Sequence, residues 1–283
     1  MIRRWLRNGL DQAGLVAKAY DVRARATNAV DRETRRQNAE FQAAGAPDGL
    51  PLPPPSLVYL VAGHFNVEWY YSSGASHAAL LRKVLETNGF NLREFDSLLD
   101  FGCGCGRVIR HWRDEPISRL HGSDYNPRLI EWCRRSLPFA EFETNRRAPP
   151  LAYDNDRFDF IYAISVFTHL TEDLQSTWMR ELERVLAPGG LVSITTKGRS
   201  RLEPLDDEER RRFESGKLVV QDARYEGRNL CAAYHPERYV REELAGALEV
   251  VDFVPAVAAS AQTQDFYLLR KPTQVDALGS TPR

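Results

Sequence analysis

The most informative segment of the sequence is Leu98-Leu-Asp-Phe-Gly-Cys-Gly-Cys-Gly-Arg107. Its three alternating glycines, Gly102, Gly104 and Gly106, follow a short apolar strand predicted over 97–101 and precede a helix predicted over 107–113. Glycine lets the backbone turn tightly and approach a ligand closely, and the start of a helix offers free amide groups. Since open parallel sheets bind ligands at the carboxyl ends of their strands, we expect a ligand site at this turn.

Strands and helices alternate around this turn. The predicted strands are 97–101, 119–124, 140–144, 158–167 and 191–196, and the predicted helices are 76–88, 107–113, 127–137 and 171–186. We expect Thr171 to cap the last helix and Pro188-Gly-Gly to end it. Such alternation indicates a parallel sheet with crossover helices.

The alternation breaks after Gly198. A charged segment follows, with a short helix predicted over 206–213 and short strands over 218–220 and 230–234. A helix is then predicted over 236–246, and two strands, 248–254 and 265–270, are expected to form an antiparallel pair at the sheet edge.

The composition divides the chain into four parts. Residues 1–50 form a helical N-terminal extension and 51–94 a linker with an aromatic lead-in, while 95–271 form the main domain with a substrate-side insertion over 199–235 and 272–283 form a loose tail. The extension is basic and its apolar stripe is thin, which favours a solvated helix packed on the main domain. A helix that contacts a membrane surface or a partner is the alternative.

The composition also excludes several classes of protein. The chain has 283 residues, with 38 basic residues against 39 acidic ones, so bulk charge does not favour a nucleic-acid partner. It has no long apolar run and no secretory signal, so we expect no transmembrane segment. Its four cysteines do not form a disulfide framework, which predicts a reduced, cytoplasmic protein. Cys103 and Cys105 lack a partner pair, so we expect no metal.

An acidic residue after the second predicted strand narrows the class of ligand expected at the turn. Asp124 ends the second predicted strand, about twenty residues after the glycines, where a carboxylate can accept both hydroxyls of a ribose. The dinucleotide fingerprint requires glycine at position 107, where this chain has Arg107, and the phosphate-binding P-loop motif is absent. An adenosine-containing ligand other than a dinucleotide is therefore expected.

Residues 95–197 resemble a class I S-adenosylmethionine-dependent methyltransferase. The resemblance rests on four segments, Asp100-Phe-Gly-Cys-Gly-Cys-Gly, Gly122-Ser-Asp-Tyr-Asn, Phe158-Asp-Phe-Ile-Tyr-Ala-Ile-Ser-Val-Phe and Glu183-Arg-Val-Leu-Ala-Pro-Gly-Gly. It implies an α/β fold, Rossmann-like and doubly wound, with a mostly parallel seven-stranded sheet and an antiparallel edge strand. The flanks 60–94 and 235–271 resemble small methyltransferases of glycan and natural-product pathways.

The resemblance also implies a cofactor, S-adenosylmethionine, and the residues that bind it. Gly102, Cys103 and Gly104 would hold the methionine part through their backbone, with Asp100 close by. Asp124 would bind the ribose, Tyr125 would lie beside the adenine and Asn145 at its edge, and Ser165 would lie at the exit of the fourth strand.

Methyl transfer to a hydroxyl benefits from a general base, and His169 is the first candidate. It follows the fourth strand, beside the expected methyl donor; its alternative role is to cap the next helix or pack on the cofactor loop. His235, His64 and Glu68 are further candidates. The insertion 199–235 and the aromatic segment 57–75, with Trp69, Tyr70 and Tyr71, are expected to supply the acceptor pocket, although core packing also explains these aromatic residues.

The resulting hypothesis is O-methylation of a small-molecule or glycan acceptor. A non-catalytic protein that binds S-adenosylmethionine is the alternative, and an NAD(P)-dependent oxidoreductase is opposed by Arg107. A nucleic-acid methyltransferase is opposed by the charge balance and by Ile164-Ser-Val-Phe, which stands where amino-methylating DNA enzymes carry Asn/Asp-Pro-Pro-Tyr/Phe. The sequence does not identify the acceptor or the oligomeric state.

Overall fold

The computed structural model describes residues 32–256 and 263–273 of the chain. The remainder of the N-terminal extension and of the C-terminal tail lies outside the described residues. The chain forms two compact units, Met1–Ser72 and Ser73–Arg283. Among the residues described, no helix is both long and apolar enough to cross a bilayer.

The first unit contains the helices α3 (Arg32–Ala44) and α4 (Pro55–Ala62) and the start of α5 (Val67–Thr87). The buried side chain of Asn38 ties two of them together, because its Nδ2 donates to the Phe65 carbonyl (2.8 Å) and its Oδ1 accepts from the Val67 amide (2.9 Å). The helix predicted over 76–88 is longer than expected, since it begins nine residues earlier, at Val67. The prediction missed the cap of this helix, Asn66, whose Oδ1 accepts from the Trp69 amide (2.7 Å).

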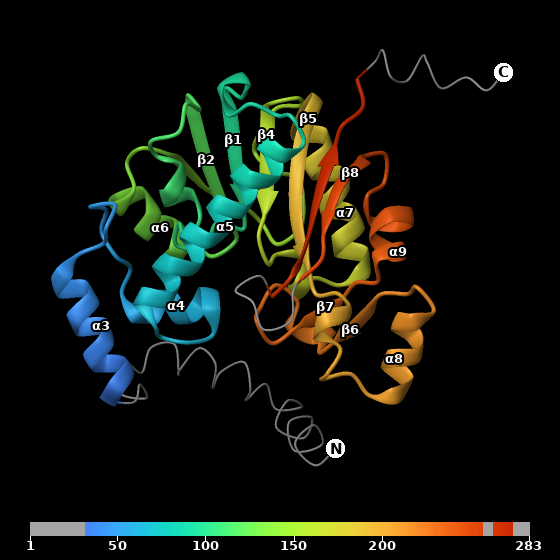
Figure 1. Ribbon diagram of the computed structural model, residues 1–283, viewed down its shortest axis with the longest axis horizontal. Helices are drawn as coiled ribbons and strands as arrows, with labels where there is room; N and C mark the ends of the chain where they lie inside the picture. The colour runs from blue at the N-terminus through green and yellow to red at the C-terminus, as the bar shows by residue number, and fades with distance from the viewer. Residues whose placement is uncertain (1–31, 257–262, 274–283) are drawn as a thin grey trace. The chain divides into compact units, whose positions relative to one another are not determined.

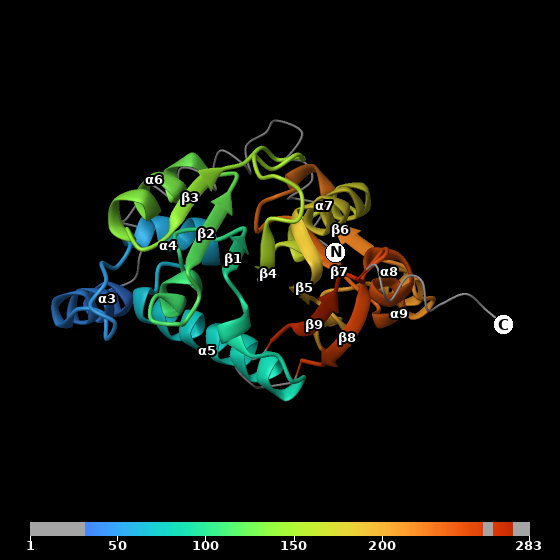
Figure 2. The same ribbon diagram turned by 90° about the horizontal axis from the view of Figure 1, so that it is seen from above.

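The second unit is built on the predicted seven-stranded sheet. Its strands, in spatial order, are β3 (Glu141–Thr144), β2 (Arg119–Asp124), β1 (Ser97–Phe101), β4 (Phe158–Ala163), β5 (Leu186–Thr196), β9 (Asp265–Arg270) and β8 (Glu249–Val254). Figure 2 shows this succession across the sheet. All neighbours from β3 to β5 pair in parallel, whereas β9 pairs antiparallel with both β5 and β8, so the fold class is confirmed.

Helices cover the sheet. The helix α6 (Pro127–Ser136) packs against β2 and β3, and α7 (Glu172–Val185) packs against β5. Phe158, Ile161, Val192 and Tyr267 of the sheet join the apolar side of α7 in one buried core. Because β4 and β5 are buried along most of their length, the carboxyl ends of these strands are held rigidly.

The insertion forms a small substructure at the carboxyl end of β5 (Figure 1). It contains α8 (Asp207–Glu214) and a two-stranded sheet of β6 (Val219–Gln221) and β7 (Ala232–Tyr234). Lys197, the residue after β5, forms a parallel bridge with Tyr234 of β7. The insertion is thereby tied to the main sheet at the edge where ligands are expected.

Short helical turns complete the second unit. They are η2 (Leu92–Glu94), η3 (Ile109–Trp112), η4 (Phe167–His169), η5 (Arg199–Arg201) and η6 (Ala223–Tyr225), all of the 3₁₀ type. The helix predicted over 236–246 is α9 (Glu237–Tyr239), which continues as a π-helix, η7 (Val240–Leu244). The helix predicted over 107–113 was wrong, since only η3 forms. Gly106 is left-handed (φ 79°), and the few residues that remain before Pro116 make an α-helix marginal.

Two predicted boundaries near α7 were also wrong. The helix ends at Val185 and β5 begins at the next residue, so Pro188-Gly-Gly lies inside the strand, where the Gly189 amide donates to the Lys271 carbonyl (2.9 Å). Thr171 occupies the N-cap position, but its hydroxyl hydrogen-bonds Glu226 instead of capping the helix.

Candidate active site

The glycine turn is fixed by contacts with both neighbouring strands. The amides of Gly102 and Cys103 donate to the Ser123 carbonyl of β2 (2.8 and 2.9 Å). Gly102 and Gly104 have left-handed backbones (φ 75° and 57°), and a Cβ on Gly102 would lie 2.4 Å from a methyl carbon of Val166, just after β4. Only glycine fits this approach, and the turn presents bare backbone at the carboxyl edge of the sheet.

Asp124, the residue expected at the ribose, lies at the end of β2 against the glycine turn. Its Oδ2 accepts from the Gly104 amide (3.0 Å) and its Oδ1 from the Asn126 amide (2.8 Å), so both oxygens are oriented by backbone. A carboxylate oxygen has two lone pairs, which leaves each oxygen able to accept one ribose hydroxyl. Burial raises the pKa of Asp124 to about 6, so the carboxylate form prevails at neutral pH.

Asp100 lies deeper, at the end of β1. The Tyr162 hydroxyl donates to its Oδ2 (3.0 Å), and burial raises the pKa of Asp100 to about 7, partly offset by Tyr162 and Arg107. Arg107, which replaces the fingerprint glycine, is itself buried, with Nη1 3.3 Å from Ser73 Oγ and 3.1 Å from His77 Nδ1. The arginine therefore connects the glycine turn to α5.

The residues expected at the adenine lie together. Tyr125 is half-buried, with the Arg147 guanidinium 5.5 Å from its ring centroid. The Asn145 amide donates to the Asp124 carbonyl (3.2 Å), and its side-chain Nδ2 donates to the Arg146 carbonyl (2.6 Å). Asn145 Oδ1 is buried with no hydrogen-bond partner among the described residues.

The chain turns sharply after β4, so the strand predicted over 158–167 ends early, at Ala163. Ser165 has a left-handed backbone (φ 64°) and its amide donates to Thr195 Oγ1 of β5 (2.7 Å). Its hydroxyl accepts from Gln264 Nε2 (2.9 Å). The turn places Val166 against Gly102, at the carboxyl edge of the sheet.

His169 is held in one tautomer. Its Nδ1 lies 2.7 Å from the Cys231 carbonyl, and since a carbonyl only accepts, Nδ1 carries the proton and Nε2 has a lone pair. Nε2 forms no hydrogen bond within the described part of the chain. Burial and the charge of Lys197 lower the pKa of His169 to about 4, so the ring is neutral at pH 7.

The other candidate bases do not share this arrangement. His235 is fully buried, and its Nε2 lies 3.1 Å from Gln175 Oε1, so it acts as a link between β7 and α7. His64, Glu68 and the aromatic residues Trp69, Tyr70 and Tyr71 belong to the first compact unit.

Cys103 and Cys133 both lie against the glycine turn as buried thiols. Their Sγ atoms are 3.6 and 3.5 Å from the Gly104 carbonyl, and burial raises the pKa of Cys103 well above its usual value. Within the described ranges no group of three or more His, Cys, Asp or Glu side chains is arranged to hold a metal ion.

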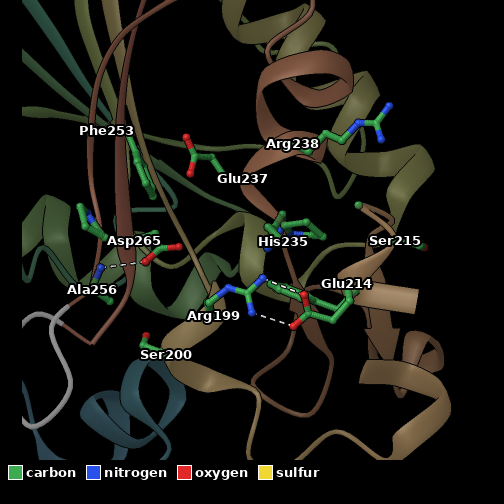
Figure 3. A pocket seen from close by; sticks show the side chains of 14 residues that line it. Arg199, Ser200, Glu214, Ser215, His235, Glu237, Arg238, Phe253, Ala256 and Asp265 are labelled. Atoms are coloured by element: carbon green, nitrogen blue, oxygen red, sulfur yellow. Dashed lines mark hydrogen bonds and ion pairs between the residues drawn. The ribbon is translucent and has the colours of Figure 1, made fainter. Parts of the chain in front are cut away.

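A pocket of about 550 Å³ opens between the insertion and the β8–β9 end of the sheet (Figure 3). Arg199 and Glu214 form a double ion pair across it (2.7 Å for each contact), and the buried Asp265 accepts from the Ala256 amide (2.8 Å). Of the residues singled out in the sequence, only His235 lines this pocket.

Comparison with known proteins assigns the family. Residues 74–255, more than half of the chain, match a family model described as "Methyltransferase domain". The chain belongs to this methyltransferase family. The resemblance to class I S-adenosylmethionine-dependent methyltransferases is thereby confirmed, and S-adenosylmethionine is the cofactor.

The methyltransferase is similar to named methyltransferases of other organisms. It is 30% identical over 105 residues to malonyl-[acyl-carrier protein] O-methyltransferase of Enterobacter lignolyticus. The matched segment covers 37% of this chain and 40% of that protein. It is 30% identical over 102 residues to methyltransferase GfsG of Streptomyces halstedii, which covers 34% of this chain and 36% of that protein. The chain therefore spans less than half the length of these relatives.

A solved structure shares the fold. It is the 1,6-didemethyltoxoflavin-N1-methyltransferase of Burkholderia thailandensis with bound 1,6-didemethyltoxoflavin and S-adenosylhomocysteine. The TM-score is 0.53 at 19% identity, with 78% of this chain and 92% of that chain covered. At this identity the likeness concerns the fold of the methyltransferase alone.

Reasoning from the sequence did not single out several residues near the candidate base. Lys197, Cys231 and Gly227 lie around His169: the Gly227 amide donates to the His169 carbonyl (2.8 Å), and a Cβ on Gly227 would lie 3.9 Å from the Tyr125 ring. The loop 222–231 thus connects the surroundings of Tyr125 to those of His169. The position of Lys197 at the end of β5 was the one available signal, because ligands bind at that edge.

Proposed function

We propose that this methyltransferase transfers a methyl group to a hydroxyl oxygen of a small-molecule or glycan acceptor, with His169 as general base. The supporting observation is the tautomer of His169, whose Nε2 lone pair is free of internal hydrogen bonds beside the turn that follows β4. The low pKa of His169, about 4, keeps this lone pair available at neutral pH.

The cofactor contacts belong to the same proposal. The residues that we propose to hold S-adenosylmethionine are Asp100, Gly102, Cys103, Gly104, Asp124, Tyr125, Asn145 and Ser165. The spare lone pairs of Asp124 and the unpartnered Oδ1 of Asn145 support a fit to the ribose and adenine. When bound, the cofactor supplies an electrophilic methyl group on a sulfonium.

The chain's own residues have three tasks in the proposed reaction. The rigid glycine turn positions the cofactor, and the insertion orients the acceptor and excludes water. His169 Nε2 would accept the proton of the acceptor hydroxyl as that oxygen bonds to the methyl carbon, and the carbon–sulfur bond that breaks would leave S-adenosylhomocysteine. Cys103, Cys133 and Cys231 are buried thiols outside any disulfide, which supports a reducing compartment, and we propose a cytoplasmic location.

Calorimetry tests cofactor binding first. S-adenosylmethionine and S-adenosylhomocysteine are expected to bind, and NADH is not. Binding of NADH without a response to either sulfur compound would refute the proposal.

Transfer of radiolabelled methyl to a panel of hydroxyl and amine acceptors then identifies the acceptor atom. His169→Gln is expected to lower kcat by at least about 100-fold, since general-base catalysis contributes about 10²–10⁴-fold. His235→Gln is the matched control, because it removes another buried histidine near Lys197 and should change kcat little. Cofactor binding without transfer to any acceptor would favour the alternative, a non-catalytic binding protein.

A further inference from the structure

Lys197 occupies a fixed position at the edge of the sheet where His169 lies. It follows the last residue of β5, pairs with Tyr234 in a parallel bridge, and its carbonyl accepts from the His235 amide (2.8 Å). The backbone of Lys197 is therefore held between the main sheet and the insertion, and its side chain cannot move far from this junction.

The ammonium group of Lys197 is partly buried without a counterion. Its Nζ lies 5.8 Å from the centroid of the Tyr234 ring, and in the described part of the chain it forms no hydrogen bond or ion pair. Burial lowers the pKa of Lys197, and the nearby charge of Arg201 lowers it further. The Nζ atom keeps contact with solvent, so this partly buried ammonium can exchange water for an anionic group of a ligand.

The neighbours of this ammonium do not supply a negative charge. Cys231 is the residue that favours the charged lysine, but burial raises the pKa of its thiol to about 11, so it is neutral at pH 7. The two histidines that feel the charge of Lys197, His169 and His235, are neutral as well. Glu226 and Asp222 lie near enough to Cys231 to raise the pKa of its thiol, but no carboxylate of the described residues forms an ion pair with Lys197 Nζ.

Lys197 also lies close to the proposed base. Its charge lowers the pKa of His169, and Cys231, which perturbs Lys197, accepts the Nδ1–H of His169 through its carbonyl. An acceptor whose hydroxyl reaches His169 Nε2 would bring its neighbouring atoms near this ammonium. A lysine is a point charge that binds oxyanions such as carboxylate and phosphate.

We propose that Lys197 is the anion-binding residue of the acceptor site and that the acceptor of this methyltransferase carries a carboxylate or phosphate group. This inference rests on the proposed function, and it narrows the acceptor to acidic small molecules. Neutral sugars and neutral aromatic compounds would leave the ammonium unpaired and are expected to be poor acceptors.

Binding of simple anions tests this assignment without knowledge of the acceptor. The probes are succinate and inorganic phosphate, with neutral succinamide as the control, added to protein saturated with S-adenosylhomocysteine at constant ionic strength. We expect saturable binding of at least one anion and none of succinamide. The anion that binds more tightly shows whether the acidic group of the acceptor is a carboxylate or a phosphate.

Variants of Lys197 then locate the binding. Lys197→Met should weaken binding of the anion by at least about 10-fold, and Lys197→Arg, which keeps the charge, should weaken it by less than about 3-fold. Lys217→Met removes an exposed lysine of the insertion and should have no effect. If Lys197→Met does not fold, Lys197→Gln serves instead.

Two outcomes would overturn the inference. One is equal anion binding by the wild type and Lys197→Met, and the other is no saturable binding of either anion by the wild type. S-adenosylhomocysteine binding, measured on the same samples, separates this failure from a failure of the proposed function. If the wild type does not bind S-adenosylhomocysteine, the proposed function is refuted.

Discussion

At the scale of residues, Asp124 holds the glycine turn with the same carboxylate that we propose to bind the ribose. Because its pKa in the free protein is about 6 and only the ionised form accepts two hydroxyls, affinity for S-adenosylmethionine should fall as pH drops below 6. Protonation of Asp124 alone should make the affinity at pH 5 about tenfold weaker than the constant affinity at high pH. Calorimetric Kd values between pH 5 and 8 measure it.

Variants separate Asp124 from the other acid of the site. Asp124→Asn should bind about 10–100-fold more weakly at pH 8 and lose the pH dependence centred near 6. Any dependence that remains nearer pH 7 belongs to Asp100. Asp154→Ala, at an exposed aspartate, should match the wild type. An unchanged pH profile in Asp124→Asn would refute the ribose-binding role.

Gly102 is the glycine with the clearest steric requirement. Gly102→Ala should lower the free energy of unfolding by about 2–4 kcal/mol, from left-handed strain and from overlap with Val166. Gly89→Ala is the matched control, since Gly89 has a similar φ (81°) but no atom within 4 Å of an added Cβ. Urea denaturation measures both.

The double variant Gly102→Ala with Val166→Ala isolates the overlap. It should be more stable than the sum of the two single changes by at least about 1 kcal/mol. Strict additivity would show that Val166 is not the atom group that excludes a side chain at Gly102.

Spacing along the chain was sufficient to single out the glycines and Asp124, which the structure brings together at one turn. Their roles in cofactor binding stay a prediction. The tautomer of His169 was not predictable, because it depends on a carbonyl 62 residues away, at Cys231. The isolation of Lys197 was equally hidden, since an unpaired charge is recognised only once all of its neighbours are placed.

At the scale of elements, α8 shows how the insertion stabilises itself. Asp206 Oδ1 accepts from the Glu208 and Glu209 amides (3.1 and 2.9 Å), and Glu209 Oε2 accepts from the Asp206 amide (3.0 Å). Asp206→Ala should therefore destabilise α8 by about 1 kcal/mol, while Asp206→Asn should retain most of the cap. Amide hydrogen exchange in α8 measures the effect, and equal exchange in both variants would contradict it.

Element type was easier to predict than element ends. The apolar run 158–167 correctly indicates a buried strand, but it contains no signal for the left-handed Ser165, so the end of β4 was misplaced. The direct passage from α7 into β5 was missed for a related reason. A Pro-Gly-Gly segment usually ends a helix, but here it follows a helix that has already ended.

At the scale of the whole molecule, alternation of strands and helices fixed the sheet. Short right-handed crossovers leave few arrangements for β1 to β5, which explains why the fold class was predictable. The place of β9 between β5 and β8 is also consistent with the predicted antiparallel pair. The division into two compact units is a property of long-range contacts that composition alone does not reveal.

Acid stability of the molecule should depend on its buried neutral histidines. Burial lowers the pKa of His235 to about 3, against an ordinary value of 6.5, so between these values the unfolded chain binds a proton that the folded chain does not. Stability conferred by a neutral His235 is thus present above pH 6.5 and lost as pH falls. His77 and His169 act in the same direction, and the raised pKa values of Asp100 and Asp124 act in the opposite one.

His235→Gln removes one of the groups that bind a proton in the unfolded chain but not in the folded one. Between pH 6 and 4 its free energy of unfolding should fall less steeply than that of the wild type, by up to about 1.4 kcal/mol per pH unit. Chemical denaturation at several pH values measures the two slopes. Parallel slopes would show that His235 is protonated in the folded state.

The burial of all four cysteines has a kinetic consequence. Cys103, Cys105 and Cys133 lie at or near the glycine turn, and Cys231 belongs to the insertion. A thiol-reactive reagent can reach them only when the surrounding structure opens, so labelling rates report local opening. Versions of the protein that retain one cysteine each would time the opening of the cofactor turn and of the insertion separately, and S-adenosylhomocysteine should slow the former by more than the latter.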